Sequence, residues 1–303
     1  MRLGNIPQPF PYQGSKRKLA PLILKCIPET TQCLFEPFAG SAAVSVAAAW
    51  TNKARKFWLN DTHVALMGLW EQIISDPAGL SAKYEKCWQA QNGRERDHYQ
   101  AVRREFNATH KPEMLLFLLA RCVKAAIRYN RNGEFNNSPD HRRKGMRPET
   151  MAQSIRLVSG LFHSRAKVTS LDYTAVLKHA GRDDLVYMDP PYQGVCKNRD
   201  SRYVGGVDYD EFVVELAELN RREVPFVVSY DGRTGEKVFG KKLPDHLNLL
   251  HAELLVGRST QATLLGRSDQ TYEALYLSQA TLRKLGRVPH FLQENRHAAT
   301  LFG

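Results

Sequence analysis

The segment LVYMDPPY at residues 185–192 combines three groups that could bind a planar heterocycle carrying an exocyclic amine. Its apolar beginning predicts a short buried strand, which ends at the two prolines because they cannot extend a strand ladder. The strand therefore brings the carboxylate of Asp189 to its carboxyl end. The proline pair stiffens the turn and fixes the carbonyl of Pro190, and Tyr192 adds an aromatic face. Two acceptors can take two N–H donors while the ring stacks.

A strand that exits into a turn with a solvated carboxylate is the alternative interpretation of this segment. It is the more common one for Asp-Pro-Pro alone. The tyrosine at position 192 and the motifs that precede the segment in the chain favour a binding site instead. In open α/β sheets, ligands bind at the carboxyl ends of the strands.

Residues 33–50, CLFEPFAGSAAVSVAAAW, predict a strand, a turn and a helix in the order found at nucleotide-type sites. Ser41 is placed to cap the Ala-rich helix. The small residues Ala39 and Gly40 would let a ligand approach the backbone closely. The turn lacks the GxGxxG pattern, so a loop that cradles a dinucleotide phosphate is not supported.

Two further strands are expected to end in an acid. The first is FWLND, residues 57–61, where Asp61 is the candidate acceptor for ribose hydroxyls. Its alternative role is to cap a helix that begins near Thr62, and both roles could hold together. The other is AKVTSLD, residues 166–172, which ends in Asp172.

The segment FPYQGSKRKL, residues 10–19, places basic residues around a Gly-Ser turn just before an apolar stretch. From such a loop Lys16 could reach a carboxylate or a phosphate. A solvated charged loop is the alternative.

The charge of the chain favours a polyanionic partner. Among its 303 residues, 43 are Lys or Arg and 31 are Asp or Glu, which gives a formal charge of +12 and a pI near 9.5. Over residues 62–165 the basic residues exceed the acidic ones by seven. The same interval has helical periodicity without strand alternation, which predicts an inserted helical domain.

A predicted hairpin lies inside this interval, because Asn132-Gly133 is a strong turn signal within RYNRNGEFNNS, residues 128–138. Its Arg and Asn side chains could read base edges, while the basic run at residues 141–147 would hold phosphates. A solvated surface loop is the alternative, and the interleaved aromatic and amide residues count against it. The candidate nucleic-acid contacts are Arg128, Asn130, Arg131, Asn136, Arg142, Arg143 and Lys144.

The remaining sequence features bound the class of protein. The five cysteines form no CxxC pair and the histidines are scattered, so we expect reduced thiols and no metal. Without a signal-peptide pattern or a run of 18 apolar residues, a soluble cytoplasmic protein with no membrane partner is expected. A mobile polar loop is expected at residues 193–206, a helix at 210–222, a buried strand at 224–230 and an antiparallel strand pair between 246 and 278. The basic tail, residues 280–303, has no assigned role.

Taken together, these pieces resemble the Dam-type DNA adenine-specific methyltransferases, which use S-adenosylmethionine. The resemblance extends from about residue 10 to residue 279. The matching pieces are PYQGSKRKL, FEPFAGSAAVS, the strand ending in Asp61, RYNRNGEFN, the strand ending in Asp172, DPPY, PFVVSYD and TYEALYLS, in the order that the family shows.

The resemblance implies a Rossmann-like α/β fold with a seven-stranded sheet that contains one antiparallel strand. Residues 1–61 and 166–279 would form the catalytic domain, and residues 62–165 an inserted helical target-recognition domain with its hairpin at about 128–147. The loop after the first strand would hold S-adenosylmethionine together with strand-end acids, and the segment near residue 12 would close over it. The implied cofactor residues are Tyr12, Lys16, Glu36, Phe38, Ala39, Gly40, Ser41, Asp61, Asp172 and Asp189.

The activity implied by the resemblance is site-specific methyl transfer from S-adenosylmethionine to the exocyclic amine of an adenine flipped out of duplex DNA. Asp189, Pro190 and Tyr192 would be the catalytic residues. The alternatives are an RNA adenine or guanine amine methyltransferase, and an inactive nucleic-acid-binding module on the same scaffold. A cognate restriction endonuclease acting on the same site is a partner that the family allows.

Overall fold

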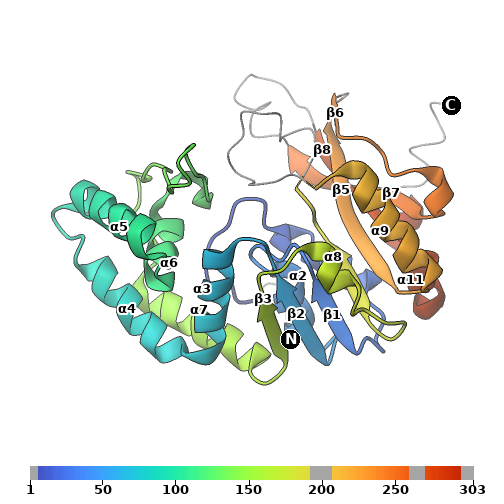
Figure 1. Cartoon of the computed structure of the whole chain (residues 1–303), viewed down its shortest axis with the longest axis horizontal. Helices are drawn as coiled ribbons and strands as arrows, with labels where there is room; N and C mark the ends of the chain where they lie inside the picture. The colour runs from blue at the N-terminus through green and yellow to red at the C-terminus, as the bar shows by residue number, and fades with distance from the viewer. Residues whose placement is uncertain (1–5, 192–206, 236, 259–269, 295–303) are drawn as a thin grey trace.

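The computed structural model describes residues 6–191, 207–235, 237–258 and 270–294, and its strands form one mixed sheet (Figure 1). The strands are β1 (Cys33–Glu36), β2 (Lys56–Asn60), β3 (Ala166–Thr169), β4 (Leu185–Met188), β5 (Phe226–Thr234), β6 (Lys237–Phe239), β7 (Leu250–Arg258) and β8 (Gln270–Leu277). The helices are α1 (Ala20–Ile23), α2 (Ala43–Trp50), α3 (Val64–Ser75), α4 (Pro77–Gln89), α5 (Glu95–Thr109), α6 (Pro112–Arg121), α7 (Pro148–Phe162), α8 (Tyr173–Leu177), α9 (Tyr209–Arg221), α11 (Gln279–Leu285) and α12 (His290–Glu294), with short 3-10 turns at η2 (Lys16–Lys18), η3 (Leu24–Cys26), η4 (Val123–Ala125) and η5 (Asp245–Leu247).

Strand order in the sheet is β3-β2-β1-β4-β5-β8-β7, and β6 pairs with β5 outside this path. The first five strands are mutually parallel, while β8 runs antiparallel to both of its neighbours. The mostly parallel α/β sheet and the antiparallel pairing of the last two strands confirm the sequence analysis. The sheet has eight strands rather than seven, because β5 continues past an irregularity after Ser229 and turns back at Gly235, whose φ of +59° suits a tight turn.

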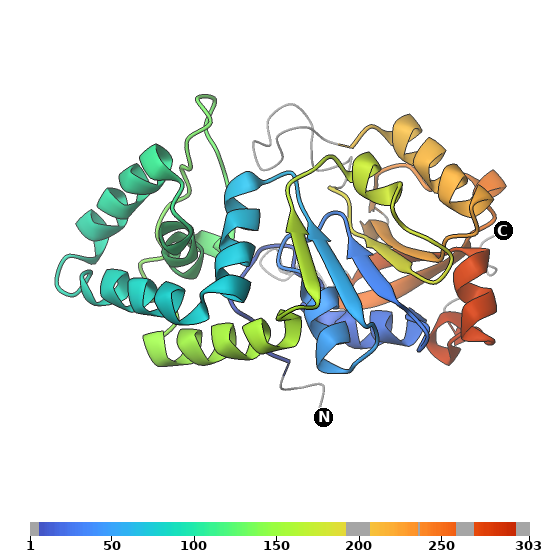
Figure 2. The same ribbon diagram turned by 60° about the horizontal axis from the view of Figure 1, so that its bottom comes forward.

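The alternation of side chains along each strand explains why both faces of the sheet are covered. On β1, Leu34 belongs to the core cluster shared with α1, α2 and the helices of the insertion, while Phe35 faces α8 and α9. On β4, Tyr187 lies in the same cluster as Leu34, and Val186 lies in the same cluster as Phe35. These strands are apolar up to Glu36 at the end of β1, because neither face of the sheet meets water there. Figure 2 shows the helices on the two sides of the sheet.

The helical insertion shares one hydrophobic core with the sheet rather than being joined to it by a linker. Phe162 at the end of α7 packs edge-on against Phe57 of β2, with ring centroids 5.3 Å apart. In Figures 1 and 2, α3 and α7 lie beside the sheet and α4, α5 and α6 lie beyond them. The helices α3 and α7 therefore link the sheet to the outer helices.

The described part of the chain adds three further findings. None of its helices combines the length and the apolar character needed to cross a membrane. Its four cysteines, Cys26, Cys33, Cys87 and Cys122, are free. The beginning of the basic tail is folded, since α12 buries Leu292 in the main core.

Candidate active site

The carboxyl ends of the parallel strands meet at one edge of the sheet, and the strand order reverses between β1 and β4 at this edge. After β1 the chain moves outward to β2, whereas after β4 it moves to β5 on the opposite side. Such a reversal opens a crevice in which α/β proteins bind ligands. Three of the acids predicted from the sequence follow strands at this edge: Asp61 after β2, Asp172 after β3 and Asp189 after β4.

Asp189 forms a largely buried ion-pair cluster with Lys16 and Glu273. The Nζ atom of Lys16 lies 2.8 Å from Oδ1 of Asp189, 2.8 Å from Oδ2 of Asp189 and 2.8 Å from Oε1 of Glu273. The side chains of the three residues are only 10–21% exposed. The expectation that Lys16 could reach a carboxylate is confirmed. Glu273, on β8, was missed, because one acid within a β-strand carries no signal of its own in a single sequence.

The electrostatics of this cluster follow from its burial. Burial raises the pKa of Asp189, the charge of Glu273 raises it further, and Lys16 opposes the change. Burial alone would lower the pKa of Lys16, but the two carboxylates outweigh it and raise that pKa. With all three groups ionised, the cluster carries one excess negative charge, which suits a cationic ligand. Pro190 is buried directly after Asp189, and Tyr192 lies outside the described residues.

The loop after β1 is held by contacts on both sides of Gly40. The amide of Gly40 donates to Oδ2 of Asp61 over 3.0 Å, and its carbonyl accepts from Nε1 of Trp70 over 2.9 Å. Gly40 has φ +48°, and a Cβ atom there would meet the ring of Tyr12 at 3.1 Å. The absence of a Cβ atom at Gly40 thus makes room for this ring, and the close approach of a ligand to Ala39 and Gly40 stays a prediction.

Ser41 does not cap helix α2, contrary to the sequence analysis. Ala42 occupies the N-cap position with φ +45°, and the Oγ atom of Ser41 donates to Oγ of Ser15 over 2.9 Å. The first turn of α2 uses the buried carboxylate of Glu36 instead, whose Oε2 accepts from the amide of Ser45 over 3.1 Å. Burial raises the pKa of Glu36 to about 8.

Asp61 does not cap helix α3, so the alternative role considered for it is wrong. The helix begins at Val64, and its cap is His63, whose Nδ1 accepts from the amide of Leu66 over 3.0 Å. Asp61 instead accepts from the amide of His63 over 3.0 Å as well as from the glycine of the β1 loop. It is half-buried at the sheet edge, and each of its oxygens keeps a lone pair for a further donor.

Asp172 precedes Tyr173 in the chain, and Phe38 packs against the ring of Tyr173. Asp172 is exposed and caps α8, with Oδ1 accepting from the amide of Thr174 over 2.9 Å and from its hydroxyl over 2.6 Å. The rings of Phe38 and Tyr173 lie 5.1 Å apart. A residue missed from the sequence, the buried Asn60, joins the strand ends by donating to the carbonyls of Pro37 and Leu171.

A comparison with protein families identifies the chain. The model described as D12 class N6 adenine-specific DNA methyltransferase matches residues 12–256. The chain belongs to this family. The resemblance inferred from the motifs is therefore confirmed.

Similar proteins carry names that agree with this assignment. A DNA N-6-adenine-methyltransferase of Escherichia phage P1 is 27% identical over 233 residues, which cover 74% of this chain and 29% of the phage protein. A DNA adenine methylase of Haemophilus influenzae is 27% identical over 220 residues, covering 70% of this chain and 74% of that protein. The type II methyltransferase M.FokI of Planomicrobium okeanokoites is 23% identical over 279 residues, covering 88% of this chain and 42% of that protein. This methyltransferase therefore spans less than half of the phage P1 and M.FokI proteins, and about three quarters of the Haemophilus protein.

The predicted hairpin of the methyltransferase is present. Tyr129 and Phe135 form an antiparallel bridge, and Gly133 has φ +75° in the turn. Asn130 stabilises this turn, because its Oδ1 accepts from the amides of Asn132 and Glu134, each over 2.9 Å. The side-chain oxygen of Asn130 therefore makes its hydrogen bonds within the hairpin. Arg131 and Asn136 are exposed, and Arg128 is half-buried.

The hairpin contacts the segment that follows β2 through a histidine. The hydroxyl of Tyr129 lies 2.6 Å from Nε2 of His63, and the two rings stack with centroids 5.5 Å apart. Because Nδ1 of His63 accepts a helix amide, Nε2 carries the proton of the neutral ring and donates it to Tyr129. In Figure 2 the green hairpin stands at the same edge of the molecule as the carboxyl ends of the strands.

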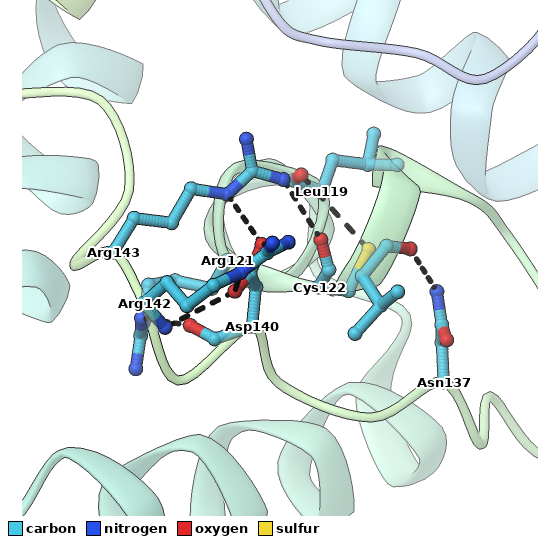
Figure 3. Close-up of polar contacts among 8 residues, drawn as sticks. Leu119, Arg121, Cys122, Asn137, Asp140, Arg142 and Arg143 are labelled. Carbon is cyan, nitrogen blue, oxygen red and sulfur yellow. Dashed lines mark hydrogen bonds and ion pairs between the residues drawn. The ribbon is translucent and has the colours of Figure 1, made fainter. Parts of the chain in front are cut away.

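The basic run after the hairpin is partly neutralised by two acids, and Figure 3 shows the contacts of the first of them, Asp140. Arg142 binds Asp140 with two hydrogen bonds of 3.0 and 3.1 Å, and Nε of Arg143 lies 3.2 Å from the same carboxylate. The Nζ atom of Lys144 lies 2.9 Å from Oε1 of Glu95. The three cations are exposed, so they can still face an anion, but each has an acidic neighbour.

Proposed function

We propose that this protein transfers a methyl group from S-adenosylmethionine to the exocyclic amine of an adenine that has been flipped out of duplex DNA. The observation that supports the proposal most is the position of Asp189 at the end of β4, at the reversal of strand order, in a buried cluster with excess negative charge. A carboxylate in this position can accept an N–H of a base amine.

The donor and acceptor groups at the strand ends fit the proposed cofactor. Its ribose hydroxyls are hydrogen-bond donors, and Asp61 offers carboxylate oxygens beside the backbone of Gly40. The exposed carboxylate of Asp172 follows β3 at the same edge, where it could approach an adenine amine. When bound, S-adenosylmethionine supplies an electrophilic methyl group on a sulfonium cation. The net negative charge of the Asp189 cluster complements that cation.

The residues of the chain would activate and hold the amine. The lone pair of an adenine amine is delocalised into the ring, so the amine is a weak nucleophile until acceptors polarise its N–H bonds. We assign this role to the carboxylate of Asp189 and the carbonyl of Pro190, and we expect Tyr192 to stack on the base. Methyl transfer leaves the nitrogen with one proton too many, and a carboxylate with a raised pKa, as at Asp189, can receive it.

The helical insertion would recognise the DNA. We propose that residues 62–165 form the target-recognition domain, with Arg131 and Asn136 near the hairpin tip available to read base edges. The exposed run from Arg142 to Lys144 would hold phosphates. The excess of basic residues over this interval supports the assignment.

The test of the proposal is methylation by the purified protein. Duplex DNA, single-stranded DNA and structured RNA are incubated separately with S-adenosylmethionine, and modified adenines are located by sequencing. We expect N6-methyladenine at one short sequence in duplex DNA, and its formation should be slower by roughly 10²–10³ with Asp189→Ala. Methylation of RNA alone would favour the RNA methyltransferase. Binding of DNA without methyl transfer would favour the inactive nucleic-acid-binding module.

A further inference from the structure

We propose that Glu273 is a positioning residue of the methyl-transfer site. When the target amine donates a hydrogen bond to an oxygen of Asp189, the ammonium of Lys16 moves toward Glu273. The inference rests on the proposed function, because it concerns how the base amine gains access to its acceptor. Glu273 does not touch the base in this scheme. It acts through Lys16.

The geometry of the cluster creates a conflict that such a residue would resolve. The Nζ atom of Lys16 lies 2.8 Å from both oxygens of Asp189, so the ammonium faces the whole carboxylate. The amine of the target base would need one of the same oxygens. Each oxygen keeps a lone pair that could accept the amine, but an ammonium in contact with both oxygens weakens them as acceptors. Movement of Lys16 away from Asp189 would therefore strengthen the activation of the amine.

Burial makes this movement expensive unless a second anion is near. The side chain of Lys16 is 10% exposed, and a buried ammonium that loses its partner is strongly destabilised. Glu273 lies 2.8 Å from the same Nζ atom and its side chain is 13% exposed. A shift of the ammonium toward Glu273 keeps a charge-assisted contact throughout, so Asp189 can be released while Lys16 stays paired with a carboxylate.

The sheet fixes the backbone of Glu273 at this place. Glu273 pairs with Gly232 of β5 directly after the register irregularity, and with Leu254 of β7 on its other side. A Cβ atom on Gly232 would meet the carbonyl oxygen of Tyr272 at 2.4 Å, so the two strands approach closely there. Held between two neighbours, Glu273 is a fixed acceptor toward which the more flexible lysine side chain can move.

Glu273→Gln tests the proposal, because it removes the charge and keeps the size of the side chain. Without this anion the ammonium should hold Asp189 more firmly. In single-turnover reactions with saturating DNA and cofactor, we expect methyl transfer to slow about tenfold or more, while the cofactor dissociation constant measured by calorimetry changes less than about threefold. Glu273→Asp, which restores the charge, should recover part of the rate.

Glu253→Gln is the matched control. Glu253 lies on the neighbouring strand β7 and pairs with Arg233 over 2.9–3.0 Å, at a site that does not include Asp189. Its replacement removes one Glu–cation pair from the same part of the sheet. We expect its single-turnover rate to match the wild type, even where its melting temperature falls as much as that of Glu273→Gln.

Lys16→Arg gives an independent test that does not depend on the folding of the Glu273 variant. A guanidinium can bind a carboxylate with two parallel hydrogen bonds, so it should release Asp189 less readily than an ammonium. We expect slower single-turnover methylation in this variant as well.

The outcomes separate this inference from the proposed function. A rate for Glu273→Gln or Lys16→Arg within about twofold of the wild type overturns the role of Glu273. An equal loss of rate in Glu253→Gln overturns it too, since the effect would then come from general damage to the sheet. A wild-type protein that methylates no DNA overturns the proposed function itself.

Discussion

The carboxylate of Asp61 and the amide of Gly40 are joined by a hydrogen bond of 3.0 Å between the ends of two neighbouring strands. The acid proposed to bind the cofactor ribose therefore also holds the loop on which the cofactor would rest. A ribose hydroxyl can use the remaining lone pairs of Asp61 without breaking this contact. The position of the loop and the affinity for the cofactor should consequently depend on the same side chain.

Replacing Asp61 by Ala should weaken cofactor binding more than it slows the reaction. The ribose contact would be equal in the ground state and the transition state, so its removal should raise the cofactor KM by about tenfold or more while kcat changes less. Asp61→Asn should retain part of the affinity, because its amide oxygen still accepts one hydrogen bond. Calorimetric titration of S-adenosylmethionine is the measurement. If Asp61→Ala binds S-adenosylmethionine as tightly as the wild type, then Asp61 only stabilises the loop after β1 and does not bind the cofactor.

Replacing Asp189 by Ala should act on the chemical step. Removal of one acceptor that polarises the amine is expected to lower kcat by roughly 10²–10³. Affinity for duplex DNA, measured by fluorescence anisotropy, should change little, because the hairpin and its basic run are untouched. Near-normal turnover in this variant would contradict the assignment of Asp189 as the acceptor.

The acids at the ends of β2, β3 and β4 were predictable from the sequence, because each follows a short segment with the pattern of a strand, which is apolar before Asp61 and Asp189 and partly polar before Asp172. The contacts that complete the site were not. Ser41 has the residue type and spacing of a helix cap, yet the cap comes from Glu36, whose buried carboxylate reaches the first turn of α2 only once the loop is folded. Glu273 lies far from Lys16 in the chain, and only the folded structure brings the strand β8 and the turn η2 together. Local sequence patterns predict strands and turns, whereas side-chain contacts between distant segments depend on how those segments pack in the fold.

Glu36 should make the stability of the protein depend on pH. Its pKa rises from 4.5 to about 8 in the folded state, so the folded protein holds a proton that the unfolded chain has lost between these values. Stability contributed by the protonated form is therefore lost as pH rises through this window, by at most about 1.4 kcal/mol per pH unit. Glu36→Gln keeps an oxygen for the amide of Ser45 and cannot ionise. Urea unfolding at pH 5, 6.5 and 8 should show wild-type stability falling relative to this variant, and parallel curves would show that Glu36 stays ionised.

The last prediction separates the reading of bases from the holding of phosphates in the insertion. Replacing Arg142 and Arg143 together by Ala removes two exposed cations that share Asp140, and it leaves that carboxylate without these two partners. Binding to all DNA sequences should weaken. The slope of log affinity against log salt should flatten by about 0.9 for each phosphate that the double variant no longer neutralises.

Arg131 should behave differently, because it is exposed near the hairpin tip rather than on the basic run. Arg131→Ala should relax the preference at one base pair, at about 1–3 kcal/mol for the correct base, and leave the salt slope nearly unchanged. Arg156→Ala, an exposed cation on α7 outside the hairpin and the basic run, is the matched control for removal of one charge. Salt titrations and methylation of a pool of randomised targets measure both properties. If the Arg142 and Arg143 double variant keeps the parental salt slope while Arg131→Ala keeps the parental sequence preference, then residues 128–147 do not recognise the target, and the DNA contacts belong to other surfaces of the helical insertion.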